Sequence, residues 1–364
     1  MNHVSTVSQV AVCFTDSYIR SIDEFIPLNS NVLILTSKSH IENGNIDDLV
    51  SGISTSKFMV CSDISPNPEI AEIQNLIDMP KATAFDFVIA LGGGSVIDTA
   101  KILSYFIKLD STTTLRESLQ NELQLTHCPT PLIAIPTTSG TGAEMTPFAT
   151  VWEKDESVKY SFTSEKIYPK LAIYDASLTV TMPFDLTLFT ALDSISHALE
   201  SLWNKNNSVI STVDSLSSLR LSFKYLPKLL NDLKNPFLRS KIQLASHLSG
   251  RAISCTRTAL AHAVSYPLTY KYDVPHGLAC SFMLSNIITD NLSEFGEMFD
   301  ERKLFGDVAV MLESFKLKDR LSAYLTRDEL ESLLNSMTSN SRAGNYLFQI
   351  NEGKLHSYVL QGIN

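Results

Sequence analysis

Residues Phe87–Lys101 read FVIALGGGSVIDTAK and combine an apolar run, three glycines and the beginning of a helical pattern. The apolar run ends at Leu91 and predicts a buried strand, and a helix is expected to begin at about Ser95. Glycines let a backbone approach a phosphate closely, and the N–H groups at a helix N-terminus stabilise its negative charge. The stretch therefore predicts a pyrophosphate site, although the same turn also serves as a tight strand-to-helix corner.

Strand-like runs and helical segments alternate on both sides of this stretch, which predicts a mostly parallel sheet built from βαβ units. From about Pro183 onward the apolar pattern has a period of 3.6 residues, with few strand signals. We expect an α/β dinucleotide-binding domain at 1–180 and an all-helical domain at 181–364. The expected strands are 9–14, 31–36, 57–62, 85–91 and 130–138, and the expected helices include 68–79, 95–108, 185–203, 213–233 and 240–254.

Length and charge restrict the classes of function. The 364 residues carry 29 basic and 39 acidic side chains, and the net charge of -10 disfavours a nucleic-acid or anionic-membrane partner. The five cysteines are scattered and never spaced as CxxC, so neither a disulfide framework nor a thiolate zinc site is expected. The same cysteine pattern fits a reduced, cytoplasmic setting. No apolar window is long enough for a spanning helix, so no membrane segment is expected.

A second loop, IPTTSGTGAEMTPF at 135–148, has similar chemistry. Hydroxyls at Thr137, Thr138 and Thr141 alternate with glycines directly after a predicted strand. Two such loops at strand ends predict a nucleotide that lies across the sheet edge. The glycine spacing is not GxGxxG, so an ordinary Rossmann dehydrogenase is not indicated.

Histidines and one aspartate form a possible metal site. In TALDSISHALE, Asp193 and His197 lie four residues apart, which places both side chains on one helix face. With His262 and His276 they make three imidazoles and one carboxylate, a set that suits Fe²⁺ or Zn²⁺. The same Asp/His spacing also suits a hydrogen bond on a helix surface, and a lone histidine in an apolar helix is often a core residue.

Four motifs in this order resemble the iron-containing (group III) alcohol dehydrogenases: GGGSVIDTAK, IPTTSGTGAEMT, DSISHALE and AHAVSYPLTYKYDVPHG. The resemblance implies an oxidoreductase with a helical metal- and substrate-binding domain, a cleft where the nicotinamide faces the metal, and a homodimer. It implies that Asp193, His197, His262 and His276 are the catalytic metal ligands. The cofactor contacts that it implies are Gly93, Gly94, Ser95, Asp98, Thr137, Thr138, Thr141, Phe148 and Lys159.

One segment of the chain departs from the common family pattern. Many members have a histidine four residues after the third ligand, where this chain has Tyr266. The segment RTALAHAVSYPLT instead resembles the phosphonoacetaldehyde reductase branch, which reduces that aldehyde to 2-hydroxyethylphosphonate. Arg257, five residues before His262, is expected on a helix about 1.4 turns away, where its guanidinium would bind a phosphonate. Thr258, Ser265 and Tyr266 are expected to add substrate contacts; an exposed, purely structural arginine is the alternative.

Cofactor choice depends on the end of the strand at 31–36. NAD-preferring relatives typically place an acid there for the ribose 2′-hydroxyl. This chain has Ser37 and Lys38, which can accept a 2′-phosphate. We expect NADPH to be preferred over NADH, unless Lys38 is merely a solvated surface residue.

The leading prediction is thus a metal-dependent, NAD(P)H-linked reductase of a small aldehyde in phosphonate metabolism. A general short-chain alcohol dehydrogenase of the same family is the nearest alternative. A dehydroquinate-synthase-like lyase and a metal-free nucleotide-binding protein are more distant alternatives, and intact residues at all four ligand positions argue against the second.

Overall fold

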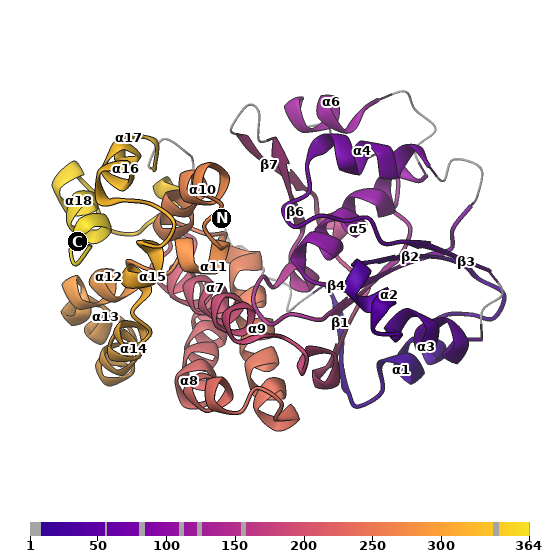
Figure 1. The fold of residues 1–364 in the computed structure, drawn as a ribbon, viewed down its shortest axis with the longest axis horizontal. Coiled ribbons are helices and arrows are strands. Elements are labelled where there is room, and N and C mark those ends of the chain that lie inside the picture. Colours follow the sequence, from indigo (N-terminus) through magenta and orange to yellow (C-terminus); the bar gives the residue numbers. More distant parts are fainter. Residues whose placement is uncertain are drawn as a thin grey trace. The chain divides into compact units, whose positions relative to one another are not determined.

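The computed structural model describes residues 9–54, 57–79, 84–108, 113–121, 126–153, 158–337 and 342–363 (Figure 1). His3, expected to be structural or solvated, lies outside the described residues. The chain divides into two compact units, which are considered separately. The first comprises Met1–Thr138 and Gly142–Thr179, and the second comprises Ser139–Thr141 and Val180–Asn364.

The first unit is built around a six-stranded sheet in the order β1-β8-β5-β4-β2-β3. Every neighbouring pair is parallel, as the alternation of strands and helices predicts. The central strands are long apolar runs because both of their faces are covered by helices. The strands are β1 (Ala11–Thr15), β2 (Asn31–Thr36), β3 (Lys57–Cys61), β4 (Phe87–Gly92), β5 (Leu132–Pro136) and β8 (Leu171–Asp175).

Helices on the two faces of this sheet bury alternate residues of each strand. Ile34 and Ile89 pack with α1 and α3 on one face, whereas Leu35 and Ala90 pack with α4, α5 and α6 on the other. Short 3-10 turns, η1 (Ala143–Met145), η2 (Glu165–Ile167) and η3 (Ala176–Thr179), complete the unit. Its helices are α1 (Tyr18–Phe25), α2 (Lys38–Glu42), α3 (Asn45–Gly52), α4 (Ile70–Asp78), α5 (Gly94–Phe106) and α6 (Leu115–Gln120).

The sequence patterns did not predict the antiparallel hairpin of β6 (Phe148–Glu153) and β7 (Val158–Thr163). Its strands carry mixed polar and apolar residues, and it forms a separate two-stranded sheet. The hairpin is fastened to α5 by Lys101, whose ammonium donates to Phe148 O at 2.7 Å. Its position is therefore set by a tertiary contact.

The second unit is helical throughout the residues that the structure describes, as expected from the 3.6-residue period. Its core is continuous, and α7 is buried along its length from Ala191 to Leu202. The major helices are α7 (Phe184–Leu202), α8 (Val209–Asn231), α9 (Pro236–Thr256) and α10 (Leu260–Tyr272). Shorter helices follow: α11 (His276–Ala279), α12 (Leu284–Asp290), α13 (Leu292–Phe299), α14 (Arg302–Ser314), α15 (Leu317–Leu321), α16 (Arg327–Ser332), α17 (Leu334–Met337), η4 (Ala343–Asn345) and α18 (Glu352–Leu360).

The expected helical position of Arg257 is wrong. Helix α9 ends at Thr256 and α10 begins at Leu260, so Arg257 lies in the connection between them. Its φ of 65° and ψ of 175° are incompatible with a helix. The 1.4-turn spacing to His262 therefore does not apply.

Among the residues that the structure describes, no helix is both long enough and apolar enough to span a membrane.

Candidate functional site

Three loops begin at one edge of the parallel sheet. Thr36 of β2 lies opposite Leu91 of β4, and Gly92 lies opposite Pro136 of β5, so these strands end together. The strand order diverges between β2 and β4, because β3 extends the sheet in one direction while β5 and β8 extend it in the other. Such a divergence is where α/β sheets bind ligands beyond the carboxyl ends of their strands.

The two glycine loops meet at this edge. A Cβ added at Gly93 would lie 3.4 Å from the Thr138 side chain, so the two backbones run close together. Gly93 is the N-cap of α5, whose N-terminus therefore faces the edge. Gly92 has a packing reason of its own, because a Cβ there would lie 2.6 Å from Val96 Cγ2. Gly92 thus forms a tight corner, and Gly93 stays the predicted phosphate contact.

Other predicted cofactor residues of the first unit already have protein partners. Thr137 Oγ1 lies 3.0 Å from His40 Nε2, and the Ser95 hydroxyl accepts from Asn67 N at 3.2 Å. Lys38 forms an exposed ion pair with the carboxylate of Asp63 at 2.8 Å, at the end of β2. Ser37 is the N-cap residue of α2, and its hydroxyl lies 2.8 Å from that of Ser39.

Asp98 is engaged inside the protein through both carboxylate oxygens. One accepts from Lys101 Nζ at 3.1 Å and the other from Thr150 N at 2.9 Å. Lys101 is wholly buried and also donates to Thr146 and Phe148. No role was predicted for this lysine, although its position three residues after Asp98 was a signal for an ion pair on one helix face. Lys159 lies on β7 with its ammonium 5.1 Å from the centre of the Trp152 ring.

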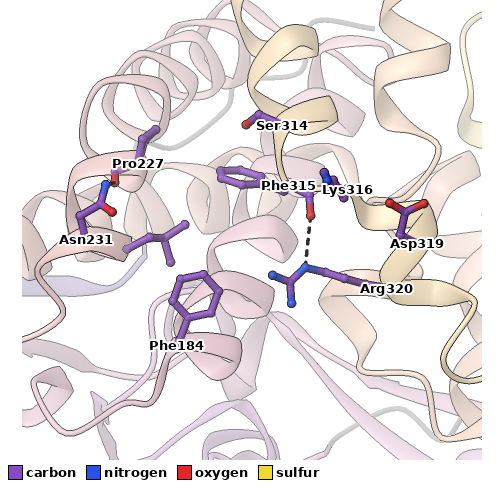
Figure 2. A pocket seen from close by; sticks show the side chains of 9 residues that line it. Phe184, Pro227, Asn231, Ser314, Phe315, Lys316, Asp319 and Arg320 are labelled. Carbon is purple, nitrogen blue, oxygen red and sulfur yellow. Dashed lines mark hydrogen bonds between the residues drawn. The ribbon is translucent and has the colours of Figure 1, made fainter.

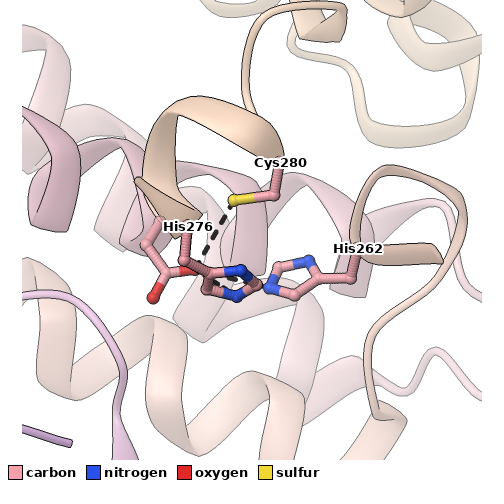
Figure 3. Close-up of side chains that lie close together, drawn as sticks. His262, His276 and Cys280 are labelled. Carbon is pink, nitrogen blue, oxygen red and sulfur yellow. Dashed lines mark hydrogen bonds and ion pairs between the residues drawn. The ribbon is translucent and has the colours of Figure 1, made fainter. Parts of the chain in front are cut away.

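In the second unit, three of the four predicted metal ligands converge on a carboxylate oxygen of the fourth, Asp193. Asp193 Oδ1 lies 3.4 Å from His197 Nε2, 3.3 Å from His262 Nε2 and 3.9 Å from His276 Nε2. Helix α7 carries the first two residues, α10 carries His262, and α11 begins with His276. Figure 3 shows the rings of His262 and His276 pointing toward each other beside Cys280.

The three distances from Asp193 Oδ1 to the imidazoles fit a divalent cation, although His197 is not among the residues whose ligand atoms all lie within 4.8 Å of one another. Four ligands placed tetrahedrally at metal–ligand distances of about 2.1 Å lie ~3.4 Å from one another. The donor set of three imidazoles and one carboxylate is suited to Fe²⁺ or Zn²⁺. The side chains of Asp193 and His262 are 5% and 3% exposed, whereas that of His276 is 27% exposed. Access to the cluster is therefore on the side of His276.

The electrostatics of the cluster also favour a cation. Burial disfavours the charge on Asp193, but the surrounding histidines hold the pKa of this carboxyl far below its usual range. Burial lowers the pKa of His197 to about 4, which keeps the lone pairs of this imidazole available. Burial opposes a charge on His262, yet Glu200 and Asp193 raise the pKa of His262 to about 9. A positive charge at this place is thus stabilised by two buried carboxylates.

The predicted substrate residues occupy different environments. Ser265 is buried, and its hydroxyl donates to His262 O at 2.8 Å, so this proton is not available to a substrate in this conformation. Thr258 is nearly buried, Tyr266 is half-buried on α10, and Arg257 is half-buried between helices. Ser265 stays a predicted substrate contact, and in this conformation its proton is taken by an intrahelical acceptor.

Comparison with known proteins adds to this geometry. Residues 10–176 match the family described as iron-containing alcohol dehydrogenase, and residues 187–359 match the C-terminal family of Fe-containing alcohol dehydrogenases. The chain belongs to the iron-containing alcohol dehydrogenase family. The expected family and fold class are thereby confirmed, and the family implies a divalent metal and a nicotinamide dinucleotide.

Curated family members match over part of their length. A 1-propanol dehydrogenase of Salmonella typhimurium is 32% identical over 65% of this chain and 60% of its own length. A bifunctional aldehyde-alcohol dehydrogenase of Escherichia coli is 29% identical over 73% of this chain. The match covers 31% of that enzyme, so the chain corresponds to about a third of it.

Solved structures match almost completely. A sulfoacetaldehyde reductase from Bifidobacterium kashiwanohense, in complex with NAD⁺, has a TM-score of 0.87 and 25% identity. The match covers 98% of this chain and 99% of that structure. An iron-containing alcohol dehydrogenase from Thermotoga maritima has a TM-score of 0.82 and 26% identity, with 97% and 98% covered.

In this iron-containing alcohol dehydrogenase family member, small residues fix His276 against α7. A Cβ added at Gly277 would lie 1.7 Å from Phe189 O, so only glycine allows this approach. The hydroxyls of Ser196 and Ser281 donate across the same contact, to Cys280 O at 3.2 Å and Leu192 O at 3.1 Å. No role was predicted for Gly277, Ser196 or Ser281 from the sequence.

Cys280 is a further unpredicted neighbour of the cluster. Its thiol donates to Asp193 Oδ1 at 3.6 Å (Figure 3), and ligand atoms of Asp193, His262, His276 and Cys280 all lie within 4.8 Å of one another. Burial raises the pKa of the Cys280 thiol, which favours a hydrogen-bond donor to Asp193 over a thiolate. Cys280 lies four residues after His276, a spacing that was a signal for two side chains on one helix face, but its contact with Asp193 depends on the packing of α11 against α7.

A separate cavity of 540 Å³ lies in the helical unit (Figure 2). Arg320 projects toward Phe184 there and donates to Phe315 O at 3.1 Å. None of the predicted ligand or substrate residues lines it, so it is not the family's catalytic site. Its lining residues are Phe184, Pro227, Leu230, Asn231, Ser314, Phe315, Lys316, Asp319 and Arg320.

Proposed function

We propose that the chain is a metal-dependent, NAD(P)H-linked reductase of a short aldehyde, with Asp193, His197, His262 and His276 as the metal ligands. The observation that carries this proposal is the convergence of three imidazoles on Asp193 Oδ1 at 3.3–3.9 Å. Family membership and the buried, charge-compensated surroundings of that oxygen support it further.

The ligands define how the reaction would proceed. A bound divalent cation would supply Lewis acidity, which stabilises the negative charge that develops on a carbonyl oxygen during hydride transfer. Asp193 offsets part of the cation's charge, and the buried His262 excludes water on the inner side of the site. His276 is the more exposed ligand, so the aldehyde would approach the cation from the side of His276. A solvent proton then completes the alcohol.

The loops at the sheet edge would hold the dinucleotide. Gly93, Gly94 and Ser95 offer backbone N–H groups at the N-terminus of α5 for the pyrophosphate. Thr137, Thr138, Thr141, Phe148 and Lys159 stay predicted contacts, whereas the carboxylate of Asp98 would act by holding β6 and Lys101 in place.

NADPH is proposed as the preferred cofactor. The Lys38–Asp63 ion pair is exposed, and such pairs are worth at most about 1 kcal/mol, so Lys38 can turn toward a 2′-phosphate. The ratio of kcat/KM for NADPH and NADH tests this choice, and Ser37→Asp should shift the ratio toward NADH. A clear preference of the wild type for NADH would contradict it.

The proposed substrate is an aldehyde with an anionic tail, first of all phosphonoacetaldehyde, which would yield 2-hydroxyethylphosphonate. Arg257 is the candidate for the tail because a guanidinium suits a tetrahedral anion and the protein is acidic. Sulfoacetaldehyde is the second candidate, favoured by the likeness to the Bifidobacterium kashiwanohense sulfoacetaldehyde reductase. In both aldehydes a methylene group separates the anion from the carbonyl carbon.

One substrate panel separates the candidates. Phosphonoacetaldehyde, sulfoacetaldehyde and propanal are compared by kcat/KM with each cofactor. Equal values for all three would identify a general short-chain alcohol dehydrogenase. The absence of net NAD(P)H oxidation with any aldehyde would favour a lyase.

The metal site has its own test. His262→Ala should lower bound iron or zinc and activity together, as measured by elemental analysis and turnover, while circular dichroism stays that of a folded protein. Full metal occupancy with normal turnover would reject this ligand assignment. A homodimer and a cytoplasmic location are also proposed, and sedimentation of the purified protein tests the first.

A further inference from the structure

Glu200 is a buried carboxylate that lies beside the metal ligands without being one of them. It is on α7, seven residues after Asp193, and none of its surface is exposed. A buried carboxylate is costly unless hydrogen-bond donors compensate it. Each of its oxygens has such a donor, and all of the donors come from the beginning of α10.

The first contact is with the ring of His262. Glu200 Oε2 is hydrogen-bonded to His262 Nδ1. An ionised carboxylate can only accept, so Nδ1 must carry the proton in this bond. In the neutral ring the lone pair is then on Nε2, the nitrogen that lies 3.3 Å from Asp193 Oδ1. Glu200 therefore selects the tautomer that a metal requires.

The second contact is with the backbone of α10. Glu200 Oε1 accepts from Ala261 N at 2.5 Å and from His262 N at 3.2 Å. These are the N–H groups that an N-cap side chain normally binds, and the N-cap residue here, Ala259, has no side-chain acceptor. Glu200 thus caps α10 from a neighbouring helix and fixes the position of His262 in the first turn of α10.

We infer that Glu200 is the positioning residue of the metal centre, through which α7 sets both the tautomer and the location of the ligand on α10. The inference rests on the proposed metal site and adds to it a residue that does not contact the metal. Partners of this kind typically change metal affinity about 10- to 100-fold when they are replaced.

Glu200→Gln tests this inference because it preserves size and reverses one hydrogen bond. The amide oxygen can still accept from the backbone of α10, but the amide NH₂ would donate to His262 Nδ1. His262 would then carry its proton on Nε2, which faces the metal position. We expect the affinity for Zn²⁺, measured by competition with a chromophoric chelator, to fall about 10- to 100-fold.

Two controls separate this role from a structural one. Asp214→Asn removes another buried carboxylate of the same unit, which binds Arg251, and should leave zinc affinity unchanged. In a His262→Ala background, Glu200→Gln should cause no further loss, because its effect acts through that ring. An equal additional loss in that background, or unchanged zinc affinity in a folded Glu200→Gln variant, would overturn the inference.

A measurement on the wild type keeps the test independent of how the variant folds. In the zinc-loaded protein, ¹⁵N NMR should show the proton of His262 on Nδ1, in slow exchange with water. A proton on Nε2 would overturn the inference. Failure of the metal site itself has a different signature, since the wild type would then bind no zinc and His262→Ala would change nothing.

Discussion

Arg257 has a backbone conformation that glycine enters readily and other residues rarely do. Its φ of 65° and ψ of 175° cost of order 1–3 kcal/mol in a non-glycine residue. Asn204 Nδ2 and Thr256 Oγ1 both donate to Arg257 O at 3.0 Å, and Asn345 Nδ2 donates to Thr258 O at 2.8 Å. These contacts hold the strained connection, which favours a functional reason for the side chain.

Comparison of Arg257→Gly with Arg257→Ala separates strain from side-chain function. The glycine variant should have the higher free energy of unfolding, by about 1–3 kcal/mol, because only glycine relieves the strain. Both variants should lose about 10- to 100-fold in kcat/KM for phosphonoacetaldehyde, with little change for propanal. Urea denaturation and steady-state kinetics give the two readouts; equal losses on both aldehydes would make Arg257 structural.

At the scale of elements, Lys101 joins α5 to the β6–β7 hairpin. Lys101→Met should lower the free energy of unfolding by about 3–5 kcal/mol, because it leaves the carboxylate of Asp98 without its cation. Thermal denaturation measures the change. The exposed Lys108→Met, near the end of the same helix, should change little, and a similar effect of both substitutions would contradict the assigned role of the buried ammonium.

The contact between α7 and α11 depends on Gly277. Gly277→Ala should displace the beginning of α11, and with it His276, because the added Cβ would meet Phe189 O at 1.7 Å. We expect zinc affinity to fall at least about tenfold. Gly306→Ala on α14 is the matched control, since a Cβ there meets nothing within 4 Å, and that variant should bind zinc normally.

Helix α9 carries a buried histidine that makes stability depend on pH. Burial, aided by Arg251, lowers the pKa of His247 to about 4, from an ordinary value of 6.5. Between these values the unfolded chain binds a proton that the folded protein does not, so stability falls as the pH falls through this window. The loss is on the order of 3 kcal/mol.

His247→Gln should remove this part of the pH dependence. Urea denaturation of the chelated wild type and variant at pH 7 and pH 4.5 gives the comparison, in which the other histidines titrate in both proteins. The free energy of unfolding should fall more in the wild type than in the variant between pH 7 and pH 4.5. Equal losses of stability in the two proteins would show that His247 does not control this part of the pH dependence.

At the scale of the whole molecule, the two units should respond to different ligands. All four proposed metal ligands belong to the second unit, whereas the glycine turn at the end of β4 belongs to the first. Zinc at 100 times its Kd stabilises the binding unit by about 2.7 kcal/mol, which slows exchange of its most protected amides about 100-fold. Hydrogen-exchange mass spectrometry should show this in peptides of α7 and α10. Equal slowing in β2 and β4 would indicate that the units open together.

The sequence predicted the sheet strands and the long helices well, because each has its own apolar period. It failed at the β6–β7 hairpin, whose mixed strands are held by the buried Lys101, and at Arg257, where polar contacts from Asn204 and Asn345 override helical continuation. It indicated the four residues of the metal cluster by motif, whereas Glu200 and Cys280 had no assigned role.

By itself the sequence determined the order of elements, the family and the types of side chain available as ligands, since periodicity and motifs are local properties of the chain. Only the tertiary structure decided that His262 meets Asp193 at 3.3 Å and that Glu200 caps α10. The physical reason is distance along the chain. Residues 200 and 262 have no local relation, and their contact arises only because α7 and α10 pack in one core and bury a carboxylate that must find its donors there.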